Sequence, residues 1–153
     1  EAGVIDMPAG YGAGVMLEKK DKWRIGFDFK QENWSQLKIY GEDGRLSDSY
    51  RFALGGEFAP DKLNGIRYYE RMDYRLGAFY SQTSLNIRDR QLHEFGITFG
   101  LGLPVIKSKS MINFAFEIGR RGTMEEGLIR EDFMEFSVGI SVYEFWFFKR
   151  RYY

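Results

Sequence analysis

The sequence predicts an all-β protein, an antiparallel transmembrane β-barrel of which about seven strands are visible. Three observations predict this class. Apolar and polar residues alternate with period two almost from end to end, and the alternating runs are long. Aromatic residues make up 18% of the chain, beside 18 glycines and only 3 prolines. Runs of roughly nine to thirteen residues are closer to the length that crosses a bilayer at a tilt than to that of soluble strands.

Composition excludes several other classes. The 153 residues carry 22 basic and 22 acidic side chains, so no net charge attracts nucleic acid. The chain has no cysteine, which excludes disulfides and thiolate metal sites. No apolar run is long enough for a membrane helix. The opening "EAGVIDMPAG" lacks the basic and apolar regions of a signal peptide, which we expect to be absent or already removed.

The first three alternating stretches are "YGAGVMLEK" (11–19), "KWRIGFDFKQ" (22–31) and "SYRFALGGEF" (49–58). In each, most alternate residues are aromatic or aliphatic, and the residues between them are mainly glycine or charged, with Met16 and Ala53 as exceptions. The second stretch could continue through "ENWSQLKIYG". This period is that of an extended chain with two different faces.

The pattern repeats in "MDYRLGAFY" (72–80), "EFGITFGLGL" (94–103), "INFAFEIGR" (112–120) and "MEFSVGISV" (134–142). Allowing for ragged ends, the sequence predicts a single β-barrel domain or barrel fragment over 1–153. The expected strands are 11–19, 22–38, 47–58, 67–80, 91–103, 110–121 and 132–143, with a tail over 144–153.

The connections also favour an outer-membrane protein. Compact turns are expected at 19–21, 59–65 and 104–110, and longer polar loops at 32–48, 81–91 and 122–132. Short turns on one side and long loops on the other are typical of outer-membrane barrels, and place the C-terminus in the periplasm. A soluble barrel or sandwich is the alternative.

In the membrane interpretation the two faces of each strand have different surroundings. The lipid-facing residues are expected to be Trp23, Ile25, Phe27, Phe29, Phe52, Leu54, Phe95, Phe99, Phe114, Phe116, Phe136, Val138 and Ile140. The lumen is expected to be lined by Arg24, Asp28, Lys30, Arg51, Glu57, Asp73, Arg75, Glu94, Glu117, Arg121 and Glu135. These mixed charges should pair, because an unpaired charge away from bulk water is costly.

Catalytic and metal-binding patterns are weak. His93 is the single histidine, and its neighbour Glu94 points to the opposite face of a strand. The carboxylates of "EEGLIRED" lack the spacing of a calcium loop. We therefore expect no enzyme, no catalytic residue, no metal and no cofactor.

The succession "GFDFKQENWS", "RFALGGEFAP", "YRLGAFY", "EFGITFGLGLP", "INFAFEIGRRGT" and "LIREDFMEFSVGIS" resembles the C-terminal half of FadL-type outer-membrane transporters, in their Bacteroidetes-like form. The resemblance extends from about Gly10 over nearly the whole chain. It implies half of a 14-stranded barrel in the outer membrane of a Gram-negative bacterium, which transports hydrophobic compounds such as long-chain fatty acids.

Other architectures and functions stay open. An odd strand number suggests a fragment of a larger barrel, and the rival is an eight-stranded barrel completed by residues 1–9 or by part of 32–48. The functional alternatives are a FadL-like shuttle of a type IX secretion system, a small structural outer-membrane barrel and an outer-membrane enzyme. Expected partners are membrane lipids, a hydrophobic ligand such as a fatty acid or detergent, and the rest of the barrel or another protein chain. Nucleic acid is not expected.

Overall fold

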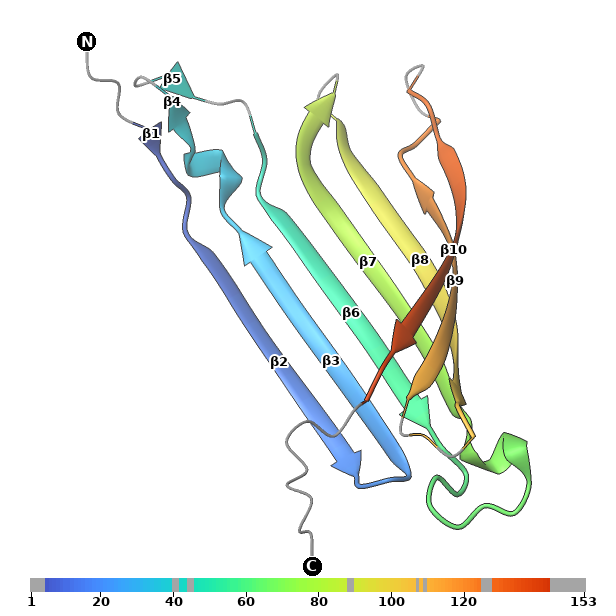
Figure 1. Ribbon diagram of the computed structural model, residues 1–153. Coiled ribbons are helices and arrows are strands. Elements are labelled where there is room, and N and C mark those ends of the chain that lie inside the picture. The colour runs from blue at the N-terminus through green and yellow to red at the C-terminus, as the bar shows by residue number, and fades with distance from the viewer. Residues whose placement is uncertain are drawn as a thin grey trace, which may run out of the picture.

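The computed structural model describes residues 5–39, 42–43, 46–87, 90–106, 108, 110–124 and 128–143. It confirms an all-β chain dominated by one open antiparallel sheet of seven strands (Figure 1). The strands are β2 (Gly10–Lys19), β3 (Trp23–Glu32), β6 (Ser49–Phe58), β7 (Asp73–Ile87), β8 (Arg90–Pro104), β9 (Met111–Arg121) and β10 (Glu131–Ser141). Among the described residues, no helix is both long and apolar enough to span a bilayer.

The seven strands follow one another across the sheet in chain order, and each pairs antiparallel with its neighbours. Such a meander needs only hairpin connections, and the first of these is tight. Asp21 adopts a positive φ of 59°, and Lys22 N–H donates to the Lys19 carbonyl over 3.0 Å. Aspartate tolerates this left-handed conformation better than most residues.

Short elements lie at both ends of the sheet. The upper rim in Figure 1 carries η1 (Trp34–Gln36) and a separate small sheet of β1 (Ile5–Asp6), β4 (Lys38–Ile39) and β5 (Glu42–Asp43). The lower rim carries η2 (Tyr68–Arg71), in the connection between β6 and β7. We define the upper rim by connections 33–48, 88–89 and 122–130, and the lower rim by 20–22, 59–72 and 105–110.

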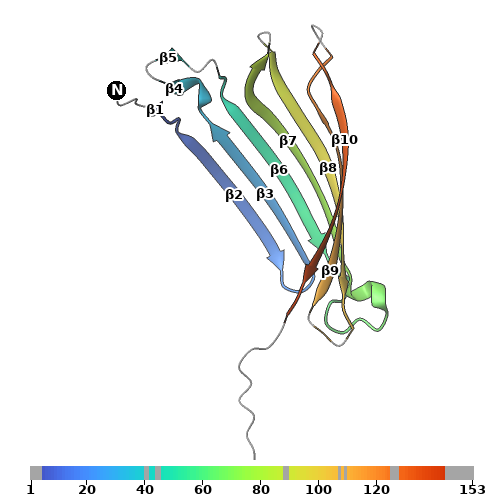
Figure 2. The same cartoon turned by 45° about the horizontal axis from the view of Figure 1, so that its top comes forward.

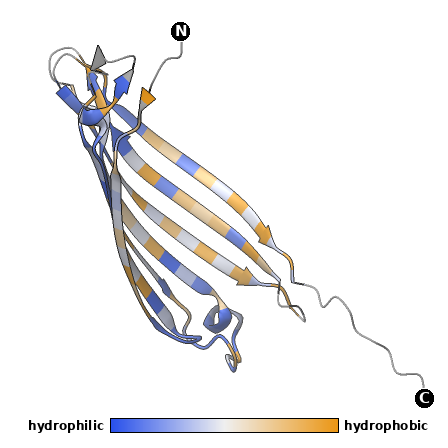
Figure 3. Ribbon diagram, turned by 90° about the vertical axis from the view of Figure 1, so that its left-hand side faces the viewer, coloured by the Kyte–Doolittle hydropathy of each residue, from blue (hydrophilic) through white to orange (hydrophobic). Residues whose placement is uncertain are grey.

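The strands are tilted and the sheet curls into a trough, so that β10 slopes the opposite way from β2 and β3 (Figures 1 and 2). Apolar and polar bands alternate along the long strands (Figure 3). The pairing register aligns these bands into rows across the sheet. One row joins Ile25, Leu76, Phe99, Phe116 and Phe136 across β3, β7, β8, β9 and β10.

Burial distinguishes the two faces. On β8, polar-face Gly96 and Gly102 are buried, whereas apolar-face Phe95 and Phe99 are 48% and 47% exposed. Side chains crowd together on the inner side of a curved sheet, so the charged face is the concave one. Large apolar side chains cover the outer, convex face.

The described part of the chain has almost no apolar core. Among the described residues, the buried hydrophobic side chains are Leu37 and Ala59, while large exposed ones are found on every strand of the main sheet. A soluble sandwich would cover the apolar face with a second layer. In the described part of the chain, no such layer lies over it.

Several predicted boundaries were wrong. The strand expected at 22–38 ends at Glu32, because η1 interrupts it two residues later, and the strand expected at 67–80 starts at Asp73, after η2. Periodicity alone does not show such short helical turns. The predicted loop 81–91 is instead part of a long hairpin, since β7 runs to Ile87 and β8 begins at Arg90.

These corrections change the loop pattern. The lower-rim connection 59–72 is long, and the upper-rim connection 88–89 is short, so loop lengths do not alternate as predicted. Smaller shifts of one or two residues affect the ends of the other strands. The predicted tail 144–153 lies outside the described residues.

The eight-stranded rival is also not supported. Its extra strand was to come from residues 1–9 or from 32–48, but β1 and β4 pair with each other, Ile5 opposite Ile39, in the small sheet. Within the described chain, the main sheet therefore has two unpaired edges, β2 and β10.

Candidate functional site

Ion pairs on the concave face link neighbouring strands near the lower rim. The register places Arg24 of β3 opposite Glu57 of β6, and Glu57 opposite Arg75 of β7. Arg24 Nη2 lies 2.7 Å from Glu57 Oε1, and Arg75 Nε lies 2.7 Å from Glu57 Oε2. The Glu57 carboxylate thus accepts hydrogen bonds from two guanidinium groups, and such charge-assisted hydrogen bonds are strong.

Arg75 continues this line across β8, where the residues below it have no side chain. Its Nη1 donates to Asn113 Oδ1 on β9 over 2.8 Å. A Cβ atom on Gly100 would lie 3.1 Å from Arg75 Cβ, and one on Gly102 would lie 3.3 Å from Arg75 Nη2. The glycines therefore leave room for the guanidinium to pass over β8.

The last link reaches the edge strand. Asn113 Nδ2 donates to Ser141 Oγ on β10 over 3.2 Å. We call the series Arg24, Glu57, Arg75, Asn113 and Ser141 the polar belt. It runs obliquely across the sheet from β3 to β10, since Asn113 lies two residues away from the row of Arg75, and Ser141 lies opposite Met111. Its Arg75–Asn113 link joins β7 and β9, which are not paired with each other.

Asp73 anchors the lower-rim connection beneath this belt. It is 1% exposed, and Lys62 Nζ lies 3.0 Å from each of its carboxylate oxygens. Arg75 Nη2 lies 3.4 Å away. A buried carboxylate needs such compensation, so Lys62 holds the loop 59–72 against the sheet.

A second set of polar contacts lies toward the upper rim. Arg121 Nη2 pairs with Glu94 Oε1 at 2.8 Å, and Arg51 lies over the Phe79 ring at 4.5 Å from its centroid. Loop residue Asp48 accepts a hydrogen bond of 3.0 Å from the Ser35 backbone N–H. Hydrogen bonds from the Ser35 side chain and backbone hold the pKa of Asp48 below its usual value.

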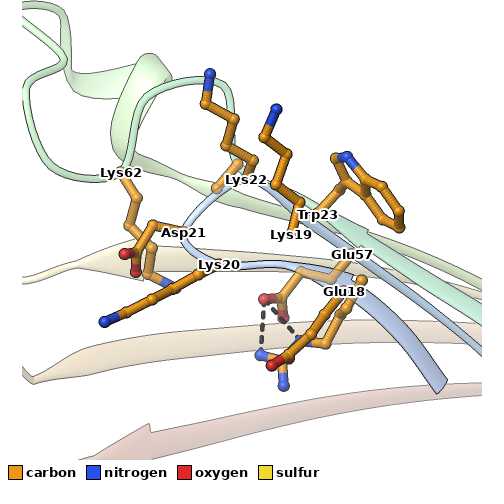
Figure 4. A pocket seen from close by; sticks show the side chains of 10 residues that line it. Glu18, Lys19, Lys20, Asp21, Lys22, Trp23, Glu57 and Lys62 are labelled. Carbon is orange, nitrogen blue, oxygen red and sulfur yellow. Dashed lines mark hydrogen bonds and ion pairs between the residues drawn. The ribbon is translucent and has the colours of Figure 1, made fainter.

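A small pocket of about 200 Å³ opens at the β2–β3 turn (Figure 4). Its lining is mostly charged, and it includes Arg24 and Glu57 of the polar belt. Lys19 and Lys22 point away from Lys20 in Figure 4. No group of three or more metal-ligating side chains occurs among the described residues, and the residues described in the pocket lining include no serine, threonine or histidine.

The structure places all predicted lumen residues on the concave face and all predicted lipid-facing residues on the convex face. Their surroundings as lumen and lipid stay predictions. Arg24, Glu57, Asp73, Arg75, Glu94 and Arg121 are brought into ion pairs with one another, and Lys30 pairs with Glu32 at 2.8 Å. Asp28, Glu117 and Glu135 have no cation within 4.0 Å among the described residues.

Sequence reasoning missed Lys62, Asn113 and Ser141. Asn113 and Ser141 are uncharged, and Lys62 belongs to a connection, so strand alternation did not select them. The register would have indicated Asn113, because it lies opposite Gly102.

His93 lies on the convex face and its Nδ1 is 2.8 Å from the Tyr80 hydroxyl. The neighbouring Glu94 pairs with Arg121 on the other face. The histidine is thus engaged with a tyrosine and not with a carboxylate. That the chain is no enzyme stays a prediction.

Glycines on the concave face accommodate aromatic rings, which gives a stability test. A Cβ atom on Gly96 would lie 2.6 Å from Phe79 Cε1, whereas one on Gly26 would have Val15 O as its nearest neighbour at 3.8 Å. We expect Gly96→Ala to lower the free energy of unfolding by about 1 to 3 kcal/mol. Gly26→Ala should change it by at most about 0.5 kcal/mol. Urea unfolding of both variants in lipid vesicles measures the difference, and equal effects would contradict the packing described.

Together, the fold and the belt define a class of protein: an all-β chain with one curved antiparallel sheet, an apolar convex face and a cross-linked, charged concave face. The family model BamG matches residues 1–153. The chain therefore belongs to the BamG family. No curated protein and no solved structure matches it significantly.

The family corrects the predicted identity. The match is to BamG and not to FadL-type transporters, so the predicted transport of fatty acids or other hydrophobic compounds was wrong. The alternatives, a type IX secretion shuttle, a small structural barrel and an outer-membrane enzyme, are not supported either. Alternating aromatic and glycine segments are common to outer-membrane strands in general, so their order carried no family-specific information. The association with the outer membrane agrees with the family.

Proposed function

We propose that this chain is a membrane-embedded subunit of the Bam complex, the machinery that assembles β-barrel proteins in the outer membrane. The family name supports the association with that complex. The single observation that supports membrane embedding is the exposed apolar convex face, opposite a charged concave face. This arrangement is the reverse of a soluble sheet's and is typical of a barrel wall.

The dimensions of the sheet fit a bilayer. Its strands are 10 to 15 residues long, and about 9 to 11 tilted residues cross the hydrocarbon core. The longer β7 and β8 would project beyond it at the upper rim. Aromatic residues near the strand ends, such as Tyr11 of β2 and Trp23 of β3, suit the interfacial regions.

A membrane sheet must also be closed, because unpaired backbone groups at a lipid-exposed edge are not tolerated. In our proposal, β2 and β10 each pair with a further strand, from the rest of the barrel or from another protein chain. The 14-stranded barrel expected from the sequence is one such closure. The role in the complex is then structural, without enzymatic chemistry or a cofactor, and membrane lipids contact the convex face.

We further propose that the lower rim faces the periplasm, so that β10 descends toward the C-terminus on that side. The chain has no cysteine, which permits a clean labelling test. In intact cells, a membrane-impermeant maleimide should label Met124→Cys at the upper rim and spare Lys20→Cys at the lower rim. Both cysteines should react after the outer membrane is permeabilised. Labelling of Lys20→Cys alone in intact cells would reverse the orientation.

The Bam association is tested by affinity purification of the tagged protein from outer membranes in mild detergent. We expect the subunits of the Bam complex to be recovered in constant ratio with it. Depletion of the protein should reduce the folded amounts of other outer-membrane barrels. A protein that is folded in the outer membrane but recovered without Bam subunits would overturn the proposed function and leave membrane embedding intact.

A further inference from the structure

One row of the concave face places two carboxylates opposite each other on neighbouring strands. Glu117 of β9 and Glu135 of β10 lie directly opposite each other in the register. On the other side of Glu117 lies Thr98 of β8, which is uncharged. Ser137 Oγ donates to Glu135 Oε1 over 3.2 Å, and no cation lies within 4.0 Å of either carboxylate among the described residues.

Two like charges opposite each other on adjacent strands are destabilising. Glu117 is half-buried and Glu135 is exposed at the open edge, and enclosure in the proposed barrel would increase the cost. In two other rows of this face, carboxylates and cations alternate across the sheet, as in Arg24, Glu57 and Arg75, or in Glu94 and Arg121. Lys30 and Arg51 also lie opposite each other, but Lys30 pairs with Glu32 and Arg51 lies over the Phe79 ring. The row that contains Glu135 ends at the unpaired edge of β10. Its next position belongs to the strand that pairs with this edge.

We propose that the strand beside β10 supplies an inward-facing arginine or lysine opposite Glu135, which neutralises the Glu117–Glu135 pair. This inference rests on the closed barrel of the proposed function. It identifies the occupant of the edge by its chemistry: an antiparallel β-strand with a cation at this one register position.

Strand direction argues against a second copy of this sheet as the occupant. Seven strands alternate in direction, so β2 and β10 run the same way. Two copies with the same orientation in the membrane would place β10 beside the other copy's β2 in parallel. Antiparallel pairing of β10 with another β10 would turn one copy upside down. Antiparallel closure needs an odd number of additional strands, the first and last of which run opposite to β2 and β10. A second set of seven strands with the opposite polarity meets both conditions, whereas a copy of this sheet in the same orientation has the wrong polarity.

A charge reversal at Glu135 tests for the proposed cation, because the substitution stabilises or destabilises the complex according to the charge on the neighbouring strand. If a partner cation faces Glu135, Glu135→Lys should lower the midpoint temperature of unfolding of the native complex by about 4 °C or more. If that position holds no cation, the same substitution creates an ion pair with Glu117 and should raise the midpoint. A raised midpoint would overturn the proposal. The loss of the folded, faster-migrating form on gels of heated outer membranes is the measurement.

Ser137→Lys is the matched control, since it adds a lysine to the same face of the same strand, opposite the uncharged Ala115. Its effect should be clearly smaller than that of Glu135→Lys, and equal losses would count against a cation at Glu135. Should the reversal variant fail to fold, a cryo-EM structure of the unmodified complex decides. We expect an arginine or lysine nitrogen of the strand beside β10 within about 4 Å of the Glu135 carboxylate. A neutral or acidic residue there would overturn the proposal, whether or not Bam subunits are present.

Discussion

Phe116→Arg is expected to lower the free energy of unfolding in a bilayer by about 2 to 4 kcal/mol, the cost of an arginine on the lipid face near the midplane. Phe116 is the middle residue of β9 and lies on the convex face between Phe99 and Phe136. In the proposed barrel its ring contacts hydrocarbon. Reversible urea unfolding of the complete barrel in lipid vesicles measures the change.

Two controls separate lipid contact from packing. Phe116→Leu keeps an apolar side chain and should cost less than about 1.5 kcal/mol. Glu117 is the next residue and lies on the concave face. Glu117→Gln removes one of the two facing carboxylates, Glu117 and Glu135, and should leave the free energy of unfolding unchanged or raise it. If Phe116→Arg left the free energy of unfolding unchanged, the convex face would contact water, and the soluble-sheet alternative would be favoured again.

Arg75→Met is expected to lower the free energy of unfolding by about 2 to 3 kcal/mol, because it removes the central cation of the polar belt. Arg75 contacts Glu57, Asp73 and Asn113 at once. Methionine fills similar space but leaves two largely buried carboxylates with one cation each. The same vesicle assay measures the loss.

Arg24→Met is the matched control for this substitution. The Arg24 side chain is 52% exposed, and among the described residues its one ion pair is with Glu57. Solvent weakens such a pair, so its loss should cost about 1 kcal/mol or less. Equal effects of the two substitutions would show that the belt is a set of independent surface pairs.

Much of the sheet could be predicted from the sequence, because period-two alternation depends only on the geometry of an extended chain. The two faces followed from it, residue by residue. The helical turns η1 and η2 could not be predicted, since a few residues of polar sequence look the same in a loop, a turn or a strand end. The hairpin of β7 and β8 extends through "SQTSLNI", whose polar residues pair at an exposed rim and were interpreted as loop.

The candidate site was predictable in its charges but not in its connections. Pairing of Arg24 with Glu57 depends on the register between β3 and β6, which a single sequence does not determine when the connection between them is long. The reach of Arg75 to Asn113, two strands further along the chain, depends on Gly100 and Gly102 of the intervening strand β8. The family was not predictable from this alternation, because many unrelated outer-membrane strands share it.

The polar belt has a consequence for the alignment of the strands during assembly. A slip of one residue between neighbours exchanges the two faces and is strongly disfavoured, but a slip of two residues preserves both the alternation and the backbone ladder. The belt discriminates against such a slip. Moving β7 by two positions relative to β6 would remove Arg75 from Glu57, and moving β8 would bring a side chain in place of Gly100 or Gly102 under the guanidinium. In a wall of near-identical alternating strands, the belt therefore distinguishes the correct alignment from its closest competitors.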